Sequence, residues 1–169
     1  MDNPFMARAI QLSIDNVHSG RGGPFGAVVV KDGAIVAEGS NQVTSTNDPT
    51  AHAEMLAIRN ACRTLGIFDL EGCEIYTSCE PCPMCLGAIY WARLSRVYFA
   101  NSDADASKVG FDDSMIYREL AQPRSQRKIP MIQMMREEAL AALVEILFSA
   151  VDALHFSAVS LAPRNCRER

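Results

Sequence analysis

The stretch CEIYTSCEPCPMCLGAIYWAR, residues 73–93, changes its pattern partway along. Its first seven residues, 73–79, are rich in apolar and β-branched side chains and are typical of a buried strand. Pro81 ends that strand and opens a helix, because proline lacks the N–H that a strand ladder needs but fits a first helical turn. The stretch therefore predicts a buried strand that leads directly into a helix.

The rest of the chain shows the same alternation of strand-like and helical patterns. Asn3-Pro4 begins a helical pattern, because asparagine caps a helix and proline fits its first turn, and Gly20 ends it. The turn KDG at 31–33 predicts a β-hairpin over 25–40. The further elements expected are a helix from 47–50 to Gly66, a strand over 96–101, a helix over 113–121, a strand over 129–135 and a helix from Arg136 to about Leu161.

This order of elements predicts a single α/β domain over residues 1–169. After the hairpin the strands alternate with helices, which favours a mixed sheet of five strands with helices on its faces. The length is sufficient for one domain with its own core. The content of 49% apolar and 21% charged residues is ordinary for a globular protein.

Charge and composition argue against several classes of function. The net charge is −4, so the chain lacks the basic surface that is typical of nucleic-acid binding. The N-terminus lacks the apolar core of a secretory signal, and the longest apolar region is shorter than the ~20 residues of a membrane span. We therefore expect a cytoplasmic protein whose six cysteines stay reduced, and in which clustered thiols indicate metal or redox chemistry.

Cys82 and Cys85 lie three residues apart at the start of the predicted helix. That spacing places both side chains on one face, and the positive end of a helix favours the thiolate form that binds metal. A C-x-x-C pair by itself also suits redox chemistry. His52, in TAHAEM at the start of another predicted helix, would complete three ligands and leave the fourth position of a zinc ion to water, as in catalytic sites.

Two neighbouring residues bear on whether such a metal is structural or catalytic. Cys79 extends the pair to C-x-x-C-x-x-C and is the rival fourth ligand of a closed structural site. Glu54 follows His52 by two residues, about 200° round an ideal helix, so that spacing alone does not bring both side chains to one point. A hydrolytic site uses such a carboxylate for proton transfer, whereas a first-turn glutamate is also common because the helix dipole favours it. The residues alone leave both interpretations open.

HAE at 52–54 together with PCPMC at 81–85 resembles the H-x-E and P-C-x-x-C signature of zinc-dependent nucleobase deaminases. Over roughly residues 5–140 the chain is similar to the small bacterial guanine deaminases of the cytidine deaminase superfamily. The stretches that carry the similarity are GGPFGAVVVKDG at 22–33, NDPTAHAE at 47–54, YTSCEPCPMCLGAIYWAR at 76–93 and GFDDSMIY at 110–117.

This resemblance implies a three-layer α/β/α sandwich, a homodimer, one zinc ion per subunit, and conversion of guanine to xanthine and ammonia. It implies that Glu54 moves protons between the zinc-bound water and the substrate. The implied zinc ligands are His52, Cys82 and Cys85, and the implied purine-binding residues are Asn41, Asp113, Phe25 and Trp91. Structural roles stay open for the last four, because Asn41 could serve a turn, Asp113 a helix cap, and the two aromatic rings the core.

The segment 141–169 departs from that family. The relatives end soon after their last helix with an aromatic residue that closes over the site, whereas residues 143–169 contain no Tyr or Trp. Two other functions also stay open. One is a tRNA adenosine deaminase, whose motifs include a DPTAHAE-like stretch, and the other is a structural zinc-binding scaffold protein.

Overall fold

The computed structural model of the protein describes residues 3–149. The chain forms two compact units, which divide between Gln122 and Pro123. This division precedes residue 141, where we expected the departing segment to begin. The end of the expected last helix and the remainder of the tail, 150–169, lie outside the described residues. Every predicted site residue belongs to the first unit.

Helix α1, Pro4–Ser19, begins and ends where the sequence predicts. Asn3 Oδ1 accepts hydrogen bonds from the backbone N–H groups of Phe5 and Met6, both at 3.0 Å, so that two of the unpaired donors at the helix start are satisfied. Gly20 ends the helix with a φ of 67°, a left-handed conformation that glycine adopts without strain.

The sheet of the first unit has the strand order β2-β1-β3-β4. The predicted hairpin is confirmed, because β1, Gly26–Lys31, pairs antiparallel with β2, Ala34–Ser40. The predicted buried strand is β3, Glu74–Cys79, which pairs antiparallel with β1 and parallel with β4, Arg96–Asn101. The sheet is therefore mixed, as expected.

The expected fifth strand over 129–135 is wrong for the described chain, whose sheet has four strands. The apolar side chains of this segment are exposed, at 79% for Ile129 and 80% for Ile132. A strand is stabilised by hydrogen bonds to a neighbouring strand, and Pro130 removes one donor from so short a segment. Within the described residues β4 accordingly pairs with β3 alone.

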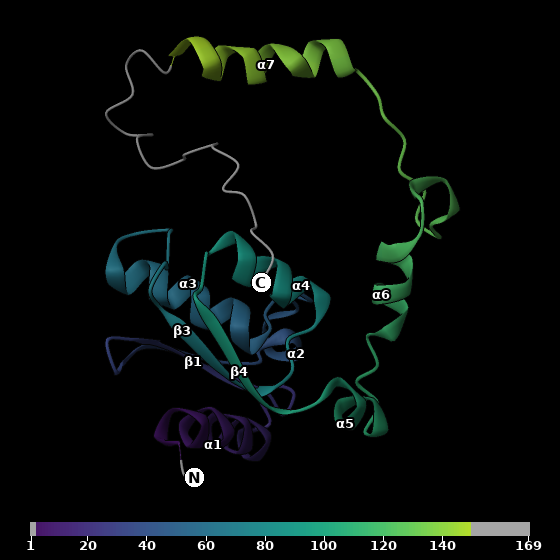
Figure 1. Cartoon of the computed structure of the whole chain (residues 1–169). Helices are drawn as coiled ribbons and strands as arrows, with labels where there is room; N and C mark the ends of the chain where they lie inside the picture. Colours follow the sequence, from purple (N-terminus) through teal and green to yellow (C-terminus); the bar gives the residue numbers. More distant parts are fainter. Residues whose placement is uncertain (1–2, 150–169) are drawn as a thin grey trace, which may run out of the picture. The chain divides into compact units, whose positions relative to one another are not determined.

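Helices cover both faces of the sheet (Figure 1). Helix α1 lies on one face, where Ala9 meets Val28 and Val30 of the central strand. Helices α3, Ala53–Leu65, and α4, Pro83–Trp91, lie on the other face. Because successive side chains of a strand point to opposite faces, β1 contributes to both cores. The three-layer α/β/α sandwich is confirmed.

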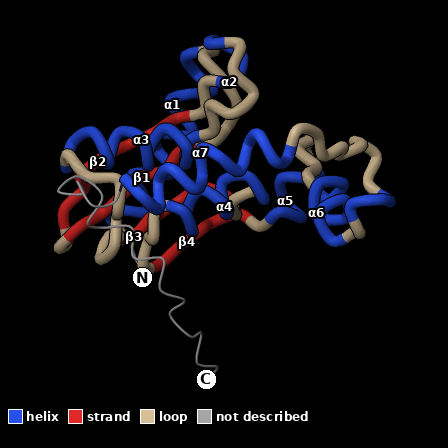
Figure 2. The backbone as a smooth tube through the Cα atoms, turned by 90° about the horizontal axis from the view of Figure 1, so that it is seen from above, coloured by secondary structure: helices blue, strands red, loops and turns tan. Residues whose placement is uncertain are grey.

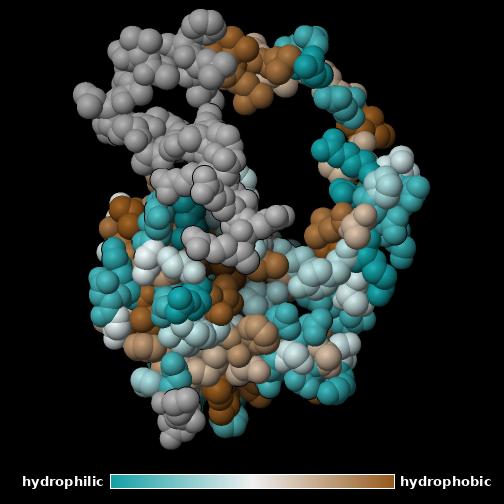
Figure 3. All heavy atoms as spheres, in the orientation of Figure 1, coloured by the Kyte–Doolittle hydropathy of each residue, from teal (hydrophilic) through white to brown (hydrophobic). Residues whose placement is uncertain are grey.

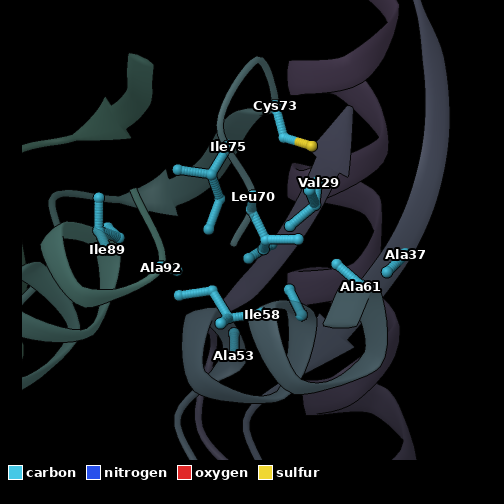
Figure 4. Close-up of a cluster of buried hydrophobic side chains, with 12 residues drawn as sticks. Val29, Ala37, Ala53, Ile58, Ala61, Leu70, Cys73, Ile75, Ile89 and Ala92 are labelled. Atoms are coloured by element: carbon cyan, nitrogen blue, oxygen red, sulfur yellow. The ribbon is translucent and has the colours of Figure 1, made fainter. Parts of the chain in front are cut away.

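The larger core lies between the sheet and the pair α3 and α4 (Figure 4), with Val29 of β1 and Ile58 of α3 among its members. Figure 2 shows these two helices lying across the red strands. Position 39 of β2 must be glycine, because a Cβ there would collide with the backbone of Ala53 and Ala57. This close approach fixes the start of α3 against the sheet.

Three short helices complete the first unit. Helix α2, Val43–Thr46, follows β2, whereas α5, Asp103–Lys108, and α6, Ser114–Ala121, follow β4. A capping box fixes the start of α5: Ser102 Oγ accepts from Asp105 N–H at 3.2 Å, and the Asp105 carboxylate accepts from Ser102 N–H at 3.2 Å. The predicted helix over 113–121 is confirmed by α6.

The second unit contains the short 3-10 helix η1, Arg124–Gln126, and α7, Arg136–Ser149, which confirms the described part of the last expected helix. Apolar side chains of this unit are exposed, including Met131 at 60% and Leu143 at 62%, and brown side chains are visible along α7 in Figure 3. None of the helices formed by residues 3–149 is long and apolar enough to cross a membrane.

Candidate functional site

The first turns of α3 and α4 bring three metal-binding side chains together. His52 is the N-cap residue of α3 and Cys82 that of α4, and Cys85 lies one turn into α4. His52 Nδ1 lies 3.5 Å from Cys82 Sγ and 3.6 Å from Cys85 Sγ. The three ligand atoms all lie within 4.8 Å of one another. The structure thus brings together the three residues that the sequence predicts as ligands.

The spacing of these atoms fits a tetrahedral zinc ion. Zinc binds cysteine sulfur at about 2.3 Å and histidine nitrogen at about 2.0–2.1 Å, so a tetrahedral site separates the nitrogen from each sulfur by about 3.6 Å. The observed separations from His52 Nδ1 are 3.5 and 3.6 Å. Two thiols and one imidazole are also the donor set that zinc prefers. Three protein ligands leave one tetrahedral position to a non-protein ligand.

Cys79 is not part of this group. Its thiol donates to the backbone carbonyl of Ser102 at 3.6 Å, and the group of possible metal ligands among the described residues contains only His52, Cys82 and Cys85. Burial, with the nearby Glu54 carboxylate, raises the pKa of Cys79 to about 11. Cys79 is therefore a buried thiol, and the closed structural site with four protein ligands is not supported.

The two ligand cysteines differ in their proton affinity. A hydrogen bond from Cys85 lowers the pKa of Cys82 to about 4, and the same bond raises the pKa of Cys85. The hydrogen bond to Cys82 raises the pKa of His52. Metal binding requires both thiols in the thiolate form and the imidazole in its neutral form, so it releases the protons that these groups hold.

Glu54 lies in the first turn of α3 and is 8% exposed. His52 has an extended backbone, with ψ of 156°, because it precedes the helix. The 200° separation of an ideal helix therefore does not apply, and both residues line one pocket. Burial raises the pKa of Glu54. A buried carboxylate with a raised pKa beside a metal-binding group is typical of proton transfer.

A pocket of about 470 Å³ opens above the metal-binding group. The predicted site residues that line it are Phe25, Asn41, His52, Glu54, Cys82 and Asp113. Cys85 is fully buried below them. Trp91 does not line this pocket; it lies near the end of α4 with 88% of its side chain exposed.

Asn41 follows β2 and is buried. Its Oδ1 accepts hydrogen bonds from the backbone N–H groups of Gly23, at 3.3 Å, and Val43, at 3.2 Å. The opposite amide orientation would set its NH2 group against these two donors, so the network fixes which atom is oxygen. Within residues 3–149 no acceptor pairs with Asn41 Nδ2. Asn41 can therefore donate hydrogen bonds to a molecule in the pocket.

Asp113 precedes α6, but its side chain does not cap that helix. The neighbouring Asp112 does so, because its Oδ1 accepts from Ser114 N–H at 2.9 Å. Burial, with the nearby Cys82 thiolate, raises the pKa of Asp113. Its carboxylate accepts no side-chain bond from the other described residues, so that it can accept one from a molecule in the pocket.

Two aromatic rings form one wall of the pocket. Phe25 and Phe111 meet edge to face, with ring centroids 4.9 Å apart and an interplanar angle of 84°. Sequence reasoning identified Phe25 but missed Phe111. The available signal was its place in GFDDSMIY, directly before the two aspartates.

Comparisons with known proteins agree with this geometry. A model of the zinc-binding region of cytidine and deoxycytidylate deaminases matches residues 1–101. The guanine deaminase of Bacillus subtilis is 58% identical over 137 residues, a span that covers 81% of this chain and 88% of that protein. An X-ray structure of guanine deaminase from the same species matches with a TM-score of 0.84 and 54% identity, covering 88% of this chain and 95% of that one.

A second group of relatives consists of tRNA-specific adenosine deaminases, of which that of Haemophilus influenzae is 35% identical over 150 residues, 81% of this chain and 86% of that protein. The tRNA-specific adenosine deaminase of Aquifex aeolicus is 50% identical over 80 residues, which are 47% of this chain and 53% of that protein.

Proposed function

The chain belongs to the family defined by the zinc-binding region of cytidine and deoxycytidylate deaminases, and we propose that it hydrolyses guanine to xanthine and ammonia. The observation that carries this substrate is a pair of groups in one pocket with the metal-binding group. Among residues 3–149, the Asn41 amide donates to no acceptor and the Asp113 carboxylate accepts from no other side chain. The similarity to guanine deaminases over most of the chain supports it.

Guanine suits this pair of groups. Its O6 and N7 atoms accept hydrogen bonds, and its ring and exocyclic N–H groups donate them. The amide of Asn41 donates to an acceptor of the purine, and the carboxylate of Asp113 accepts from neighbouring donors. Phe25 and Phe111 contribute apolar contact to the ring.

Glu54 is the residue that would transfer protons in this reaction. His52, Cys82 and Cys85 would hold a zinc ion, which would act as a Lewis acid and lower the pKa of a bound water to about 7. The Glu54 carboxylate would accept a proton from the attacking water and deliver it to a ring nitrogen of the purine. It would then accept the proton of the added hydroxyl group and deliver it to the amine, which leaves as ammonia while the new carbonyl forms. Its burial favours the protonated form, which is the form that must act as the acid.

We also propose a cytoplasmic homodimer. Tyr90 and Trp91 expose 76% and 88% of their surface on α4, and exposed aromatic side chains side by side support a protein–protein contact. A dimer of this kind would give Trp91, which does not line the pocket of its own subunit, a role in a neighbouring one. Thiols that bind metal must stay reduced, which supports the cytoplasm.

A tRNA substrate is the second candidate, since tRNA-specific adenosine deaminases match between about half and four fifths of the chain at lower identity than the guanine deaminase. The pocket lining argues against it, because it contains five carboxylates and no Lys or Arg. The five are Glu54, Glu80, Asp103, Asp112 and Asp113. Carboxylates around the pocket repel the phosphate backbone of RNA, whereas a free base without phosphates is not repelled.

The test is a side-by-side assay of the zinc-loaded protein. Guanine, adenine, cytosine, cytidine and a tRNA stem-loop are each incubated with the protein, and ammonia and the deaminated product are measured. We expect turnover of guanine to xanthine above the other four. Absence of guanine turnover at one zinc per subunit would contradict the proposal, and faster turnover of the stem-loop would reverse the two candidates.

A further inference from the structure

Asn16 is a buried polar residue on the face of α1 that packs against the sheet. It lies in the last turn of α1 and is 2% exposed. Its position belongs to none of the motifs that resemble the deaminases. A buried amide is costly unless its hydrogen bonds are made, so its partners indicate what the side chain does.

Both hydrogens of the Asn16 amide are used on the backbone of the pocket. Nδ2 donates to the carbonyl of Gly23 at 2.8 Å and to the carbonyl of Asn41 at 2.8 Å. These two acceptors come from different segments, one before β1 and one after β2. Asn16 therefore joins two pocket-lining segments that are also linked by the hydrogen bonds from Gly23 N–H to Asn41 Oδ1 at 3.3 Å and from Asn41 N–H to the Phe25 carbonyl at 3.1 Å.

The backbone around this junction is tightly packed. A Cβ at Gly22 would collide with the Asn41 carbonyl, and one at Gly26 would collide with the carbonyl of Ala9 in α1. In addition, Ser13 Oγ of α1 donates to the Pro24 carbonyl at 2.8 Å. The loop 22–25 is thus fixed against α1 on one side and against residue 41 on the other.

We infer that Asn16 is a positioning residue that orients the Asn41 amide toward the substrate. This inference rests on the proposed function, in which Asn41 donates to the purine. Without the Asn16 donors, the buried carbonyl of Asn41 loses its hydrogen bond and that of Gly23 keeps only the bond from Phe25 N–H at 2.8 Å, so that the Asn41 backbone shifts to find another donor. The Gly23 N–H then leaves Asn41 Oδ1, and the amide loses the contact that fixes its rotamer.

The test is a double-mutant cycle on KM for guanine. Asn16→Asp keeps the side-chain shape but replaces the donors with a carboxylate, which repels two carbonyls. We expect it to raise KM about tenfold, as for the loss of one or two hydrogen bonds, with kcat changed less and zinc content unchanged. In an Asn41→Ala background the same substitution should change KM less than about twofold, because the group through which Asn16 acts is absent.

Asn60→Asp is the matched control. Asn60 Nδ2 of α3 donates to the Glu38 carbonyl of β2 at 2.8 Å, which is the same kind of bond at a place that does not line the pocket. We expect this variant to lose thermal stability but to keep its KM. Asn16→Ser, which introduces no buried charge, replaces Asn16→Asp if the latter does not fold, and the same rise in KM is expected.

The crystal structure of the Asn16 variant separates this inference from the proposed function. We expect the hydrogen bond from Gly23 N–H to Asn41 Oδ1 to be lost and the zinc site to be unchanged. If the wild type does not convert guanine, the proposed function fails. If Asn41 keeps its position in the structure of the Asn16 variant, the inference about Asn16 fails. An equal rise in KM in both backgrounds also overturns it, since that is the result of a general structural defect.

Discussion

The metal-binding side of the pocket comes from the first turns of two helices, whereas the proposed base-binding side comes from the loop before β1 and from loops that follow β2 and β4. On the metal side, His52, Glu54, Cys82 and Cys85 are held directly by α3 and α4, which pack on the sheet. The base-binding side comprises Phe25, Asn41, Phe111 and Asp113. There the side chains depend on hydrogen bonds and ring contacts between segments that are distant in sequence.

This difference has a functional consequence. Zinc binding requires each ligand atom to lie within tenths of an ångström of its ideal position. Helix starts that pack against a core hold the side chains with that accuracy. Recognition of a base needs groups that surround a planar molecule, and loops can reach around it. We therefore expect substitutions on the metal side to abolish chemistry and substitutions on the base-binding side to weaken substrate binding.

The largest effect is expected for Cys82→Ala, which removes a metal ligand. Zinc content should fall well below one ion per subunit, and activity should fall to background, because the remaining two ligands hold zinc poorly. The measurement is zinc by atomic absorption on purified protein. Cys79→Ala is the matched control and should keep its zinc, since Cys79 donates to Ser102 and does not join the metal-binding group. Loss of zinc from both variants would indicate the closed four-ligand site.

The next largest effect is expected for Glu54→Gln, which keeps the side-chain shape and removes the proton acceptor. We expect kcat to fall about 10²–10⁴-fold, the range for a general acid–base residue, with zinc content unchanged. Steady-state kinetics with metal analysis check this. Glu71→Gln, at an exposed turn outside the pocket, serves as the control. A kcat within a few-fold of wild type would exclude Glu54 as the proton carrier.

A smaller effect is expected on the base-binding side for Asp113→Asn. Loss of a charged acceptor should lower kcat/KM for guanine about 10–100-fold, chiefly through KM. Asp112→Asn is the adjacent control: Asp112 Oδ1 accepts from Ser114 N–H, and asparagine supplies the same acceptor, so the variant should keep its stability and retain most of its kcat/KM. Equal kinetic losses in the two variants would mean that the aspartates act only by ordering the loop.

The smallest effect is expected at the ion pair that joins α1 to β2. Both nitrogens Nε and Nη2 of Arg8 donate to Glu38 at 2.7 Å, and this bond lowers the pKa of the carboxyl. Because the folded pKa is depressed, the stabilisation is present above the unfolded value of about 4.3 and is lost as the pH falls through the folded pKa. Both side chains are partly exposed, so Glu38→Gln should cost at most about 1 kcal/mol at pH 7.

Thermal unfolding of the wild type and Glu38→Gln between pH 7 and about pH 3.5 checks this last prediction. The difference between the two melting temperatures should shrink toward acid pH. A difference that stays constant would show that the pair does not stabilise the docking of α1.

Much of the fold could be predicted because its signals are local. Asn3, Pro4 and Gly20 mark the ends of α1, and Asp32 and Gly33 take the positive φ values of 50° and 76° that a tight hairpin turn requires. The fifth strand could not be predicted correctly, because 129–135 has the composition of a strand but no partner strand among the described residues. Pairing is a property of the assembled sheet and is not encoded in one segment.

By itself, the sequence predicted the metal-binding group of this protein: the C-x-x-C spacing at a helix start places two thiols on one face, and its combination with H-x-E resembles the zinc deaminase signature in which His52 is the third ligand and Glu54 the expected proton carrier. Only the tertiary structure decided that Cys79 stays outside the group, that Phe111 joins the pocket wall, and that Asn41 presents its donors. Those outcomes depend on hydrogen bonds and contacts between segments that meet only when the helices pack on the sheet.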